Sequence, residues 1–167
     1  MARRWETVQA AIKTKLETVS TVKNVRSGWE RVIDPVVVDE YYYVPSDTDA
    51  TERRLHTWIV AYNGVIPTRR PHDLTTYFLE YRFEVHGFLN FIEPNASDIE
   101  LRNIVDDILD VFVPGVSLGL DANATAAVTQ HDINVDQFDI ESFSDVICSH
   151  VKITIRAHVF VGGVHYT

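Results

Sequence analysis

The side chains best suited to chemistry lie near the end of the chain, where Cys148, His150 and His158 fall on one side of an alternating segment. A thiol beside an imidazole can act in nucleophilic catalysis, and imidazoles are common metal ligands. A strand rises ~3.3 Å per residue, so the two histidines are ~26 Å apart and cannot bind one ion together. A histidine from a neighbouring strand could still join either of them. We predict histidines on the wet face of a sheet, a buried inert thiol, and no catalytic or metal site.

Two groups of carboxylates are the next candidates for acid–base or cation chemistry. They are Asp106, Asp107 and Asp110 in one segment, and Asp132, Asp136 and Asp139 in another. Charged helix faces usually point to water, and the second group lacks the spacing of a calcium loop, so both groups are expected to be solvated. A facing helix end or subunit could make the first group functional. The sequence also lacks glycine-rich phosphate loops, the G-x-S-x-G elbow and the H-E-x-x-H motif, which predicts no enzyme and no cofactor.

The composition is typical of one globular domain. The chain has 167 residues, of which 46% are hydrophobic and 23% charged, with a single cysteine. Its net charge of −9 and its lack of a basic stripe argue against general binding to nucleic acid. No apolar run approaches the roughly 18 residues of a membrane span, and the charged N-terminus is unlike a secretory signal. We therefore expect a single domain, residues 1–167, that folds in the cytosol.

Apolar residues at steps of three and four predict two helices. The first carries Trp5, Val8, Ile12, Leu16 and Val19, with Gln9, Lys13 and Glu17 expected to face solvent. The second carries Leu101, Ile104, Val105, Ile108, Leu109 and Phe112. Ser97 and Glu100 have the spacing of a capping box at its start, and Pro114-Gly115 ends it.

Alternating or β-rich segments predict strands over 21–31, 35–44, 55–62 and 75–91. In a last strand, Ile147, Val151, Ile153, Ile155, Ala157 and Val159 share one face. Residues 122–130 could be strand or loop, and 132–145 mix acidic and apolar residues. Asn63-Gly64 signals a turn, and 65–74 are predicted to form a long exposed loop or arm. Without βαβ alternation, the order predicts an α+β fold. Two helices would cover one face of a largely antiparallel sheet, with long exposed loops and an arm within 45–75.

The apolar faces of the second helix and the last strand must pack together, and their residues form the predicted core. These are Leu101, Ile104, Ile108, Val151, Ile153 and Ile155. Other aromatic residues exceed what two short helices can cover: Trp29, Trp58, Phe88 and Tyr41 to Tyr43. They indicate either a larger core or a protein interface, where tyrosine and tryptophan are common. The interface candidates are Tyr41, Tyr42, Tyr43, Arg69 and Arg70.

The order of elements resembles that of a known family. An amphipathic N-terminal helix precedes a strand around VKNVRSGW, and a long strand follows with the pattern R-x-F-x-V-H-G (Arg82, Phe83, Val85, His86, Gly87). The helix NASDIELRNIVDDIL then runs from Asn95 to Leu109, and the strand HVKITIRAHV closes the chain. This layout, from about Trp5 to Val161, resembles the tail terminator and tail-completion proteins of long-tailed bacteriophages.

The resemblance implies a structural virion protein without catalytic activity, made in the host cytoplasm and located at the head-proximal end of the tail. It implies a homo-oligomeric ring, six-fold like the tail, that stops tube polymerisation and provides the head-joining surface. Its partners would be other copies, the tail tube protein and a neck or head-completion protein. DNA would only pass through the lumen, and no membrane would be bound.

Two other functions remain open from the sequence. One is a head–tail connector or head-closure protein of the neck. The other is a small α+β enzyme or ligand-binding domain in which Cys148, His150 and His158 lie near a pocket.

Overall fold

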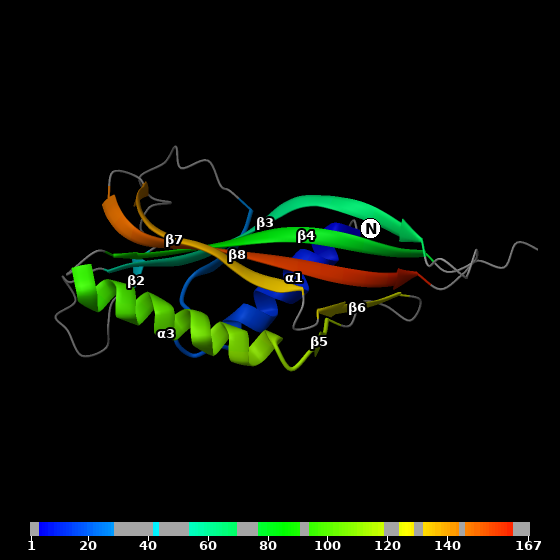
Figure 1. Cartoon of the computed structure of the whole chain (residues 1–167), viewed down its shortest axis with the longest axis horizontal. Helices are drawn as coiled ribbons and strands as arrows, with labels where there is room; N and C mark the ends of the chain where they lie inside the picture. Colours follow the sequence, from blue (N-terminus) through cyan, green and yellow to red (C-terminus); the bar gives the residue numbers. More distant parts are fainter. Residues whose placement is uncertain are drawn as a thin grey trace, which may run out of the picture.

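In the computed structural model of this protein, two helices lie along one side of a long, twisted β-sheet (Figure 1). The structure describes residues 4–28, 42–43, 54–69, 77–90, 94–118, 124–128, 132–143 and 146–161. The helices are α1 (Arg4–Glu17) and α3 (Pro94–Phe112). The strands are β1 (Val25–Ser27), β2 (Tyr42–Tyr43), β3 (Arg54–Arg69), β4 (Tyr77–Asn90), β5 (Val116–Ser117), β6 (Ala124–Val128), β7 (Ile133–Phe143) and β8 (Val146–Val161). The predicted α+β fold is confirmed. Among the described residues, no helix is both long and apolar enough to cross a membrane.

The strands β3, β4 and β8 form the centre of the sheet. β4 pairs along its length with β3 on one edge and β8 on the other, both antiparallel. The far edge of β8 is shared, because β7 pairs with residues 146–155 and β6 with residues 158–161. β5 pairs with β6. The short strands β1 and β2 pair with the first half of β3, and β1 makes the only parallel pairing among the described strands.

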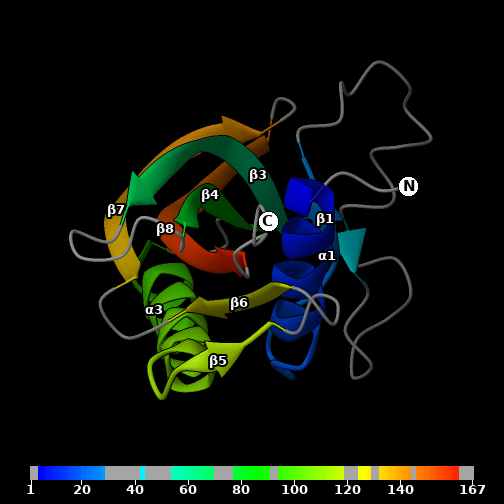
Figure 2. The same ribbon diagram turned by 90° about the vertical axis from the view of Figure 1, so that its right-hand side faces the viewer.

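One buried cluster joins both helices to a single face of the sheet. It contains Val8, Ile12 and Leu16 of α1, Leu101, Ile104, Ile108 and Phe112 of α3, and the strand residues Trp58, Val60, Phe83, Val85, Val151, Ile153, Ile155 and Ala157. Figure 2 shows both helices on the same side of β4 and β8. The six residues predicted as core are all buried, which confirms that prediction. Each such side chain contributes about 1.5–3 kcal/mol by leaving water.

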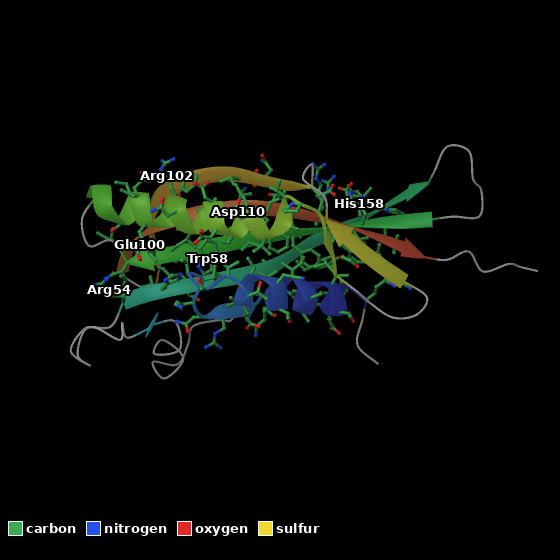
Figure 3. All side chains as sticks on the ribbon, turned by 90° about the horizontal axis from the view of Figure 1, so that it is seen from below. Arg54, Trp58, Glu100, Arg102, Asp110 and His158 are labelled. Carbon is green, nitrogen blue, oxygen red and sulfur yellow. The ribbon has the colours of Figure 1, made fainter. Side chains whose placement is uncertain are left out.

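Gly87 makes room for Trp58, the largest side chain of this cluster. The two residues are paired across β3 and β4, and Trp58 lies between the helices in the view from below (Figure 3). A Cβ atom at position 87 would lie 2.5 Å from Cζ3 of the indole ring, well inside van der Waals contact. Glycine at this position therefore lets the ring lie flat across β4.

Two details of the helices differ from the prediction. Gln9, expected to face solvent, is buried because its Nε2 donates a hydrogen bond to the carbonyl of Val60 in β3 at 2.6 Å. The capping box is also wrong, because α3 begins earlier, at Pro94. Proline suits a first helical position, since that position has no acceptor for an N–H. The Ser97 hydroxyl instead donates to the Asn90 carbonyl at 3.2 Å.

β3 continues through the predicted turn. Asn63 is a β-bulge, with the register shifting between Tyr62 and Gly64, and Gly64 has a φ of 125° that glycine adopts easily. The strand then runs on to Arg69, paired with β4 as far as Tyr77. Residues 65–69 of the predicted loop are therefore strand, and residues 70–74 lie outside the described residues.

The remaining strand predictions are confirmed in part. Of residues 21–31, only Val25–Ser27 form a strand in the described part, and of 35–44 only Tyr42–Tyr43 are described. Of the two segments left open by the sequence, 122–130 contains β6 and 132–145 contains β7. Ile147 lies on the helix side of β8, as expected, but its side chain is 62% exposed, because it is near the start of the strand and beyond the buried cluster.

Ile108→Ala and Ile153→Ala should each lower the free energy of unfolding by about 2–5 kcal/mol, because each leaves a cavity between α3 and the sheet. Ile99→Ala is the matched control on α3. Its side chain is 58% exposed, so its effect should stay within about 0.5 kcal/mol. Urea unfolding of the three variants measures these values. Similar losses at positions 99 and 108 would contradict the orientation of α3.

Gly87→Ala should cost about 1–3 kcal/mol of unfolding free energy, because the added methyl group meets the Trp58 ring. In the double variant Gly87→Ala/Trp58→Leu, the loss should be smaller than the sum of the two single losses. Equilibrium unfolding of all three variants completes the cycle. Strict additivity would mean that the methyl group and the ring do not meet.

Candidate functional site

The sheet face opposite the helices carries a set of titratable side chains, and a bulge in β7 completes it. Ile133 and Val135 pair with the buried residues Ile155 and Ile153 of β8, so they face the helices. The register then shifts at Asp136, and Phe138 pairs with buried Val151. The extra residue keeps the apolar side chains on the helix face. It also turns the acidic side chains that follow, at positions 139 and 141, toward the opposite face.

His150 lies at the centre of this set and is 4% exposed. Its Nδ1 is 2.8 Å from Oδ1 of Asp139 and 3.3 Å from Oε1 of Glu141. Its Nε2 is 3.0 Å from Nδ1 of His86 in β4. The ring also stacks on Phe88, with centroids 4.7 Å apart. Residues of β4 and β7 therefore contact both nitrogens and one ring face of this imidazole, which itself belongs to β8.

Burial keeps His86 neutral. Loss of solvation lowers its pKa, and the nearby His150 lowers it further. Glu84, whose Oε2 lies 3.5 Å from His86 Nε2, opposes this shift. A neutral His86 can accept a hydrogen bond at one nitrogen and donate one from the other, which suits it to bridge His150 and Glu84.

Cys148 is buried on the same face, and its thiol stays protonated. Burial raises the pKa of the thiol to about 11, and its Sγ donates to the Glu141 carbonyl at 3.4 Å. The thiolate is the nucleophilic form of cysteine, so this side chain is poorly suited to attack a substrate. The predicted burial of this thiol is confirmed.

Every acidic residue of the predicted second group contacts β8, contrary to the expectation that they are merely solvated. Asp132 is buried, and its Oδ1 lies 2.8 Å from Nε2 of His158. Asp136 accepts a hydrogen bond from Thr154. Asp139 contacts His150 as described above. The first group behaves as predicted at Asp106 and Asp110, which are exposed on α3. Asp107 instead accepts a hydrogen bond from the Thr21 hydroxyl at 2.7 Å.

His150 and His158 lie on one sheet face, as predicted, but the prediction that this face is exposed to water fails at His150. Position 150 is buried, and a histidine of a neighbouring strand joins it, as the sequence allowed. The sequence analysis missed Asp139 and Glu141 as its partners. The available signal was the apolar spacing in β7, which changes phase between Val135 and Phe138 and so indicates a bulge.

A shallow cavity of about 460 Å³ lies between α3 and the end of the β7–β8 hairpin. Its lining residues are Asp98, Leu101, Arg102, Phe138, Asp139, Ile140, Ser149 and His150. The Arg102 guanidinium lies 4.5 Å from the centre of the Phe138 ring and 2.8 Å from Oδ2 of Asp98. The hydrogen bond to Asp98 raises the pKa of Arg102 above its usual range. Ile140, which lines this cavity, is 62% exposed, as is Ile147 near the start of β8.

The predicted interface residues do not come together within the chain. Tyr42 and Tyr43 form β2, which pairs with Leu55 and Arg54 at the start of β3, whereas Arg69 ends β3. Fifteen residue steps along a strand span about 50 Å, so these candidates belong to opposite ends of the sheet. Tyr41 and Arg70 lie outside the described residues.

His56 faces the helices and differs from the histidines above. Its Nε2 accepts a hydrogen bond from Nε1 of Trp58 at 3.1 Å, which requires that nitrogen to be unprotonated. Burial, with a smaller contribution from Lys23, lowers its pKa to about 4. His56 is therefore a neutral structural residue of the core.

A scan against protein-family models finds no match, and a search of curated proteins finds none either. The resemblance to tail terminator proteins therefore stays a prediction.

Protonation of His56 should destabilise the protein below neutral pH. The unfolded chain takes up the proton near pH 6.5 and the folded chain only near pH 4. Stability is therefore fully present above pH 6.5 and falls as pH drops to 4, by about 3 kcal/mol from this group. In His56→Gln, whose side chain can still accept from Trp58, this part of the fall should disappear. Urea unfolding between pH 4 and 7 compares the two proteins, and equal pH dependence would contradict the assignment.

Proposed function

We propose that this protein is a structural component of a bacteriophage tail. Copies would associate head-to-tail into a ring, six-fold like the tail, on the head-proximal end of the tail tube. The ring would stop tube polymerisation and offer a surface to a neck or head-completion protein, with DNA passing through its lumen. The observation that carries this proposal is a pair of different apolar surfaces at the two ends of an elongated subunit.

The first surface, called the arm here, is the far half of β3 with its β4 partner. It carries Val65 and Ile66, which are 41% and 40% exposed. The second, called the hairpin patch, comprises Ile140 of β7 and Ile147 of β8, which are both 62% exposed. Figure 1 shows β3 ending at the right of the molecule, and the paired ends of β7 and β8 and the start of α3 at the left.

The pairing registers place the two surfaces well apart. Val65 pairs with Tyr81 of β4, whereas Ile140 pairs with Ser149, which pairs with Leu89 of the same β4. The eight steps from Tyr81 to Leu89 correspond to ~26 Å. Two separated, unlike surfaces favour heterologous association, in which each subunit uses one surface toward each neighbour. Such contacts close into a ring when the rotation between subunits allows it.

The sheet edges support the same mode of assembly. Residues 61–69 of β3 pair only with β4 among the described strands, and β7 pairs only with β8. Exposed strand edges present unpaired N–H and C=O groups, which neighbouring chains can use by strand addition. The net charge of −9 also fits a lumen that DNA passes without binding.

Mixing two variants tests the head-to-tail contact. Ile66→Asp should block the arm, and Ile147→Asp the hairpin patch, so neither variant alone should form rings in negative-stain micrographs. An equal mixture retains one intact contact per pair and should give dimers by light scattering. Val113→Asp, an exposed site after α3, is the matched control and should still assemble. Rings from both variants, or a mixture that stays monomeric, would contradict this assembly.

Loss of the protein in a phage lysate tests the role in the tail. A tube end remains a growing end until another protein covers it, so tails should become uneven and too long. Free tails of normal length with leaking heads would instead indicate a head-closure protein of the neck. Normal infectious particles would exclude both roles.

A further inference from the structure

We propose that Asp139, Glu141 and His150 bind one divalent transition-metal ion, for which Zn²⁺ is the natural probe. The site lies on the sheet face opposite the helices, and its three ligands take no part in the contacts proposed for the ring. The sequence predicts no metal site because it does not show which residues of β7 lie beside those of β8. The pairing of these two strands supplies that information.

The three ligand atoms already have the spacing of a metal site. One nitrogen of His150 and one carboxylate oxygen from each acid lie within 4.8 Å of one another. The distances from Nδ1 are 2.8 Å to Asp139 and 3.3 Å to Glu141. Zinc bonds of about 2.0–2.2 Å at a tetrahedral angle place neighbouring ligands about 3.3–3.5 Å apart. Small side-chain shifts therefore suffice to admit the ion.

The backbone positions these ligands before any ion arrives. Asp139 is paired directly with His150, and Glu141 follows two residues later on the same face. The bulge at Asp136 sets this phase, because an unbulged strand would direct both acids toward the apolar cluster. Ligands on paired strands move less than ligands on loops, which favours binding.

Two residues of β4 orient the imidazole from the side away from the carboxylates. Its Nε2 is hydrogen-bonded to Nδ1 of His86, and its ring is stacked on Phe88. Metal-bound histidines usually donate their second N–H to an acceptor, which fixes the tautomer and aims the other nitrogen at the ion. Here that other nitrogen, Nδ1, points to the two carboxylates.

The ligand chemistry selects the class of ion. One imidazole with two carboxylates suits Zn²⁺ and its first-row neighbours better than Ca²⁺, which takes six to eight oxygens. Two carboxylate charges balance a divalent ion. With three protein ligands, water would fill the fourth position, as it does in open zinc sites. The Nζ atom of Lys152 lies 3.9 Å from Oδ2 of Asp136, which is outside the three-residue set.

Calorimetric titration of untagged, EDTA-treated protein with ZnCl₂ tests the proposal. We expect one ion per subunit and at least tenfold weaker binding in Glu141→Gln. That position is 46% exposed at its side chain, so the variant should fold normally. His150→Gln should abolish binding. Asp132→Asn is the matched control, because it removes the acid of the other acid–histidine pair, with His158, and should bind Zn²⁺ as the unchanged chain does.

A second readout separates a metal site from a simple ion pair. Added Zn²⁺ should raise the thermal unfolding midpoint of the unchanged chain and of Asp132→Asn, but not of Glu141→Gln. Co²⁺ in place of Zn²⁺ should give the visible absorption of a tetrahedral site with nitrogen and oxygen ligands. Absence of stoichiometric binding, or equal binding by Glu141→Gln and the unchanged chain, would overturn the proposal.

Discussion

A single extra residue in β7 keeps the apolar side chains on one face of this sheet and the titratable side chains on the other. Side chains of a strand alternate between faces, so one inserted residue exchanges the faces of all that follow. The bulge at Asp136 makes this exchange just where the apolar residues change from odd to even positions. Without it, Asp139 and Glu141 would enter the cluster around Val151, where an unpaired carboxylate would be very costly. The bulge therefore protects the core and creates the polar site in one step.

A bulge in β3 has the same effect on the other edge of the sheet. Asn63 restores Val65 to the face of Tyr62, and its own side chain donates to Glu84 at 3.0 Å on the opposite face. The strand can therefore continue to Arg69 rather than turn back. Bulges increase local twist, and these two lie on outer strands of the four that run β3–β4–β8–β7. The fit of Trp58 against Gly87 fixes the register between β3 and β4 that both arrangements need.

Periodicity predicted the elements well, because it reports local burial. The stripes of α1 and α3 and the alternation in β4 and β8 lead directly to the core. It failed at Asn63-Gly64, because the same dipeptide suits a hairpin turn and a bulge, and only the pairing with β4 decides between them. It failed at Gln9 because the acceptor, the Val60 carbonyl, is distant in sequence. The neighbours of His150 come from two other strands, so the site could not be assembled from the sequence alone.

The proposed metal site and the proposed assembly surface occupy opposite faces of one hairpin. Ile140 lies between Asp139 and Glu141 and therefore projects to the face opposite theirs. An ion bound by the two acids would restrain the backbone on either side of Ile140. Ordering a surface before it is covered lowers the entropy lost on association, so ion binding would favour docking on the hairpin patch. The coupling needs no further contact, because successive residues of one strand project to opposite faces and share the same backbone.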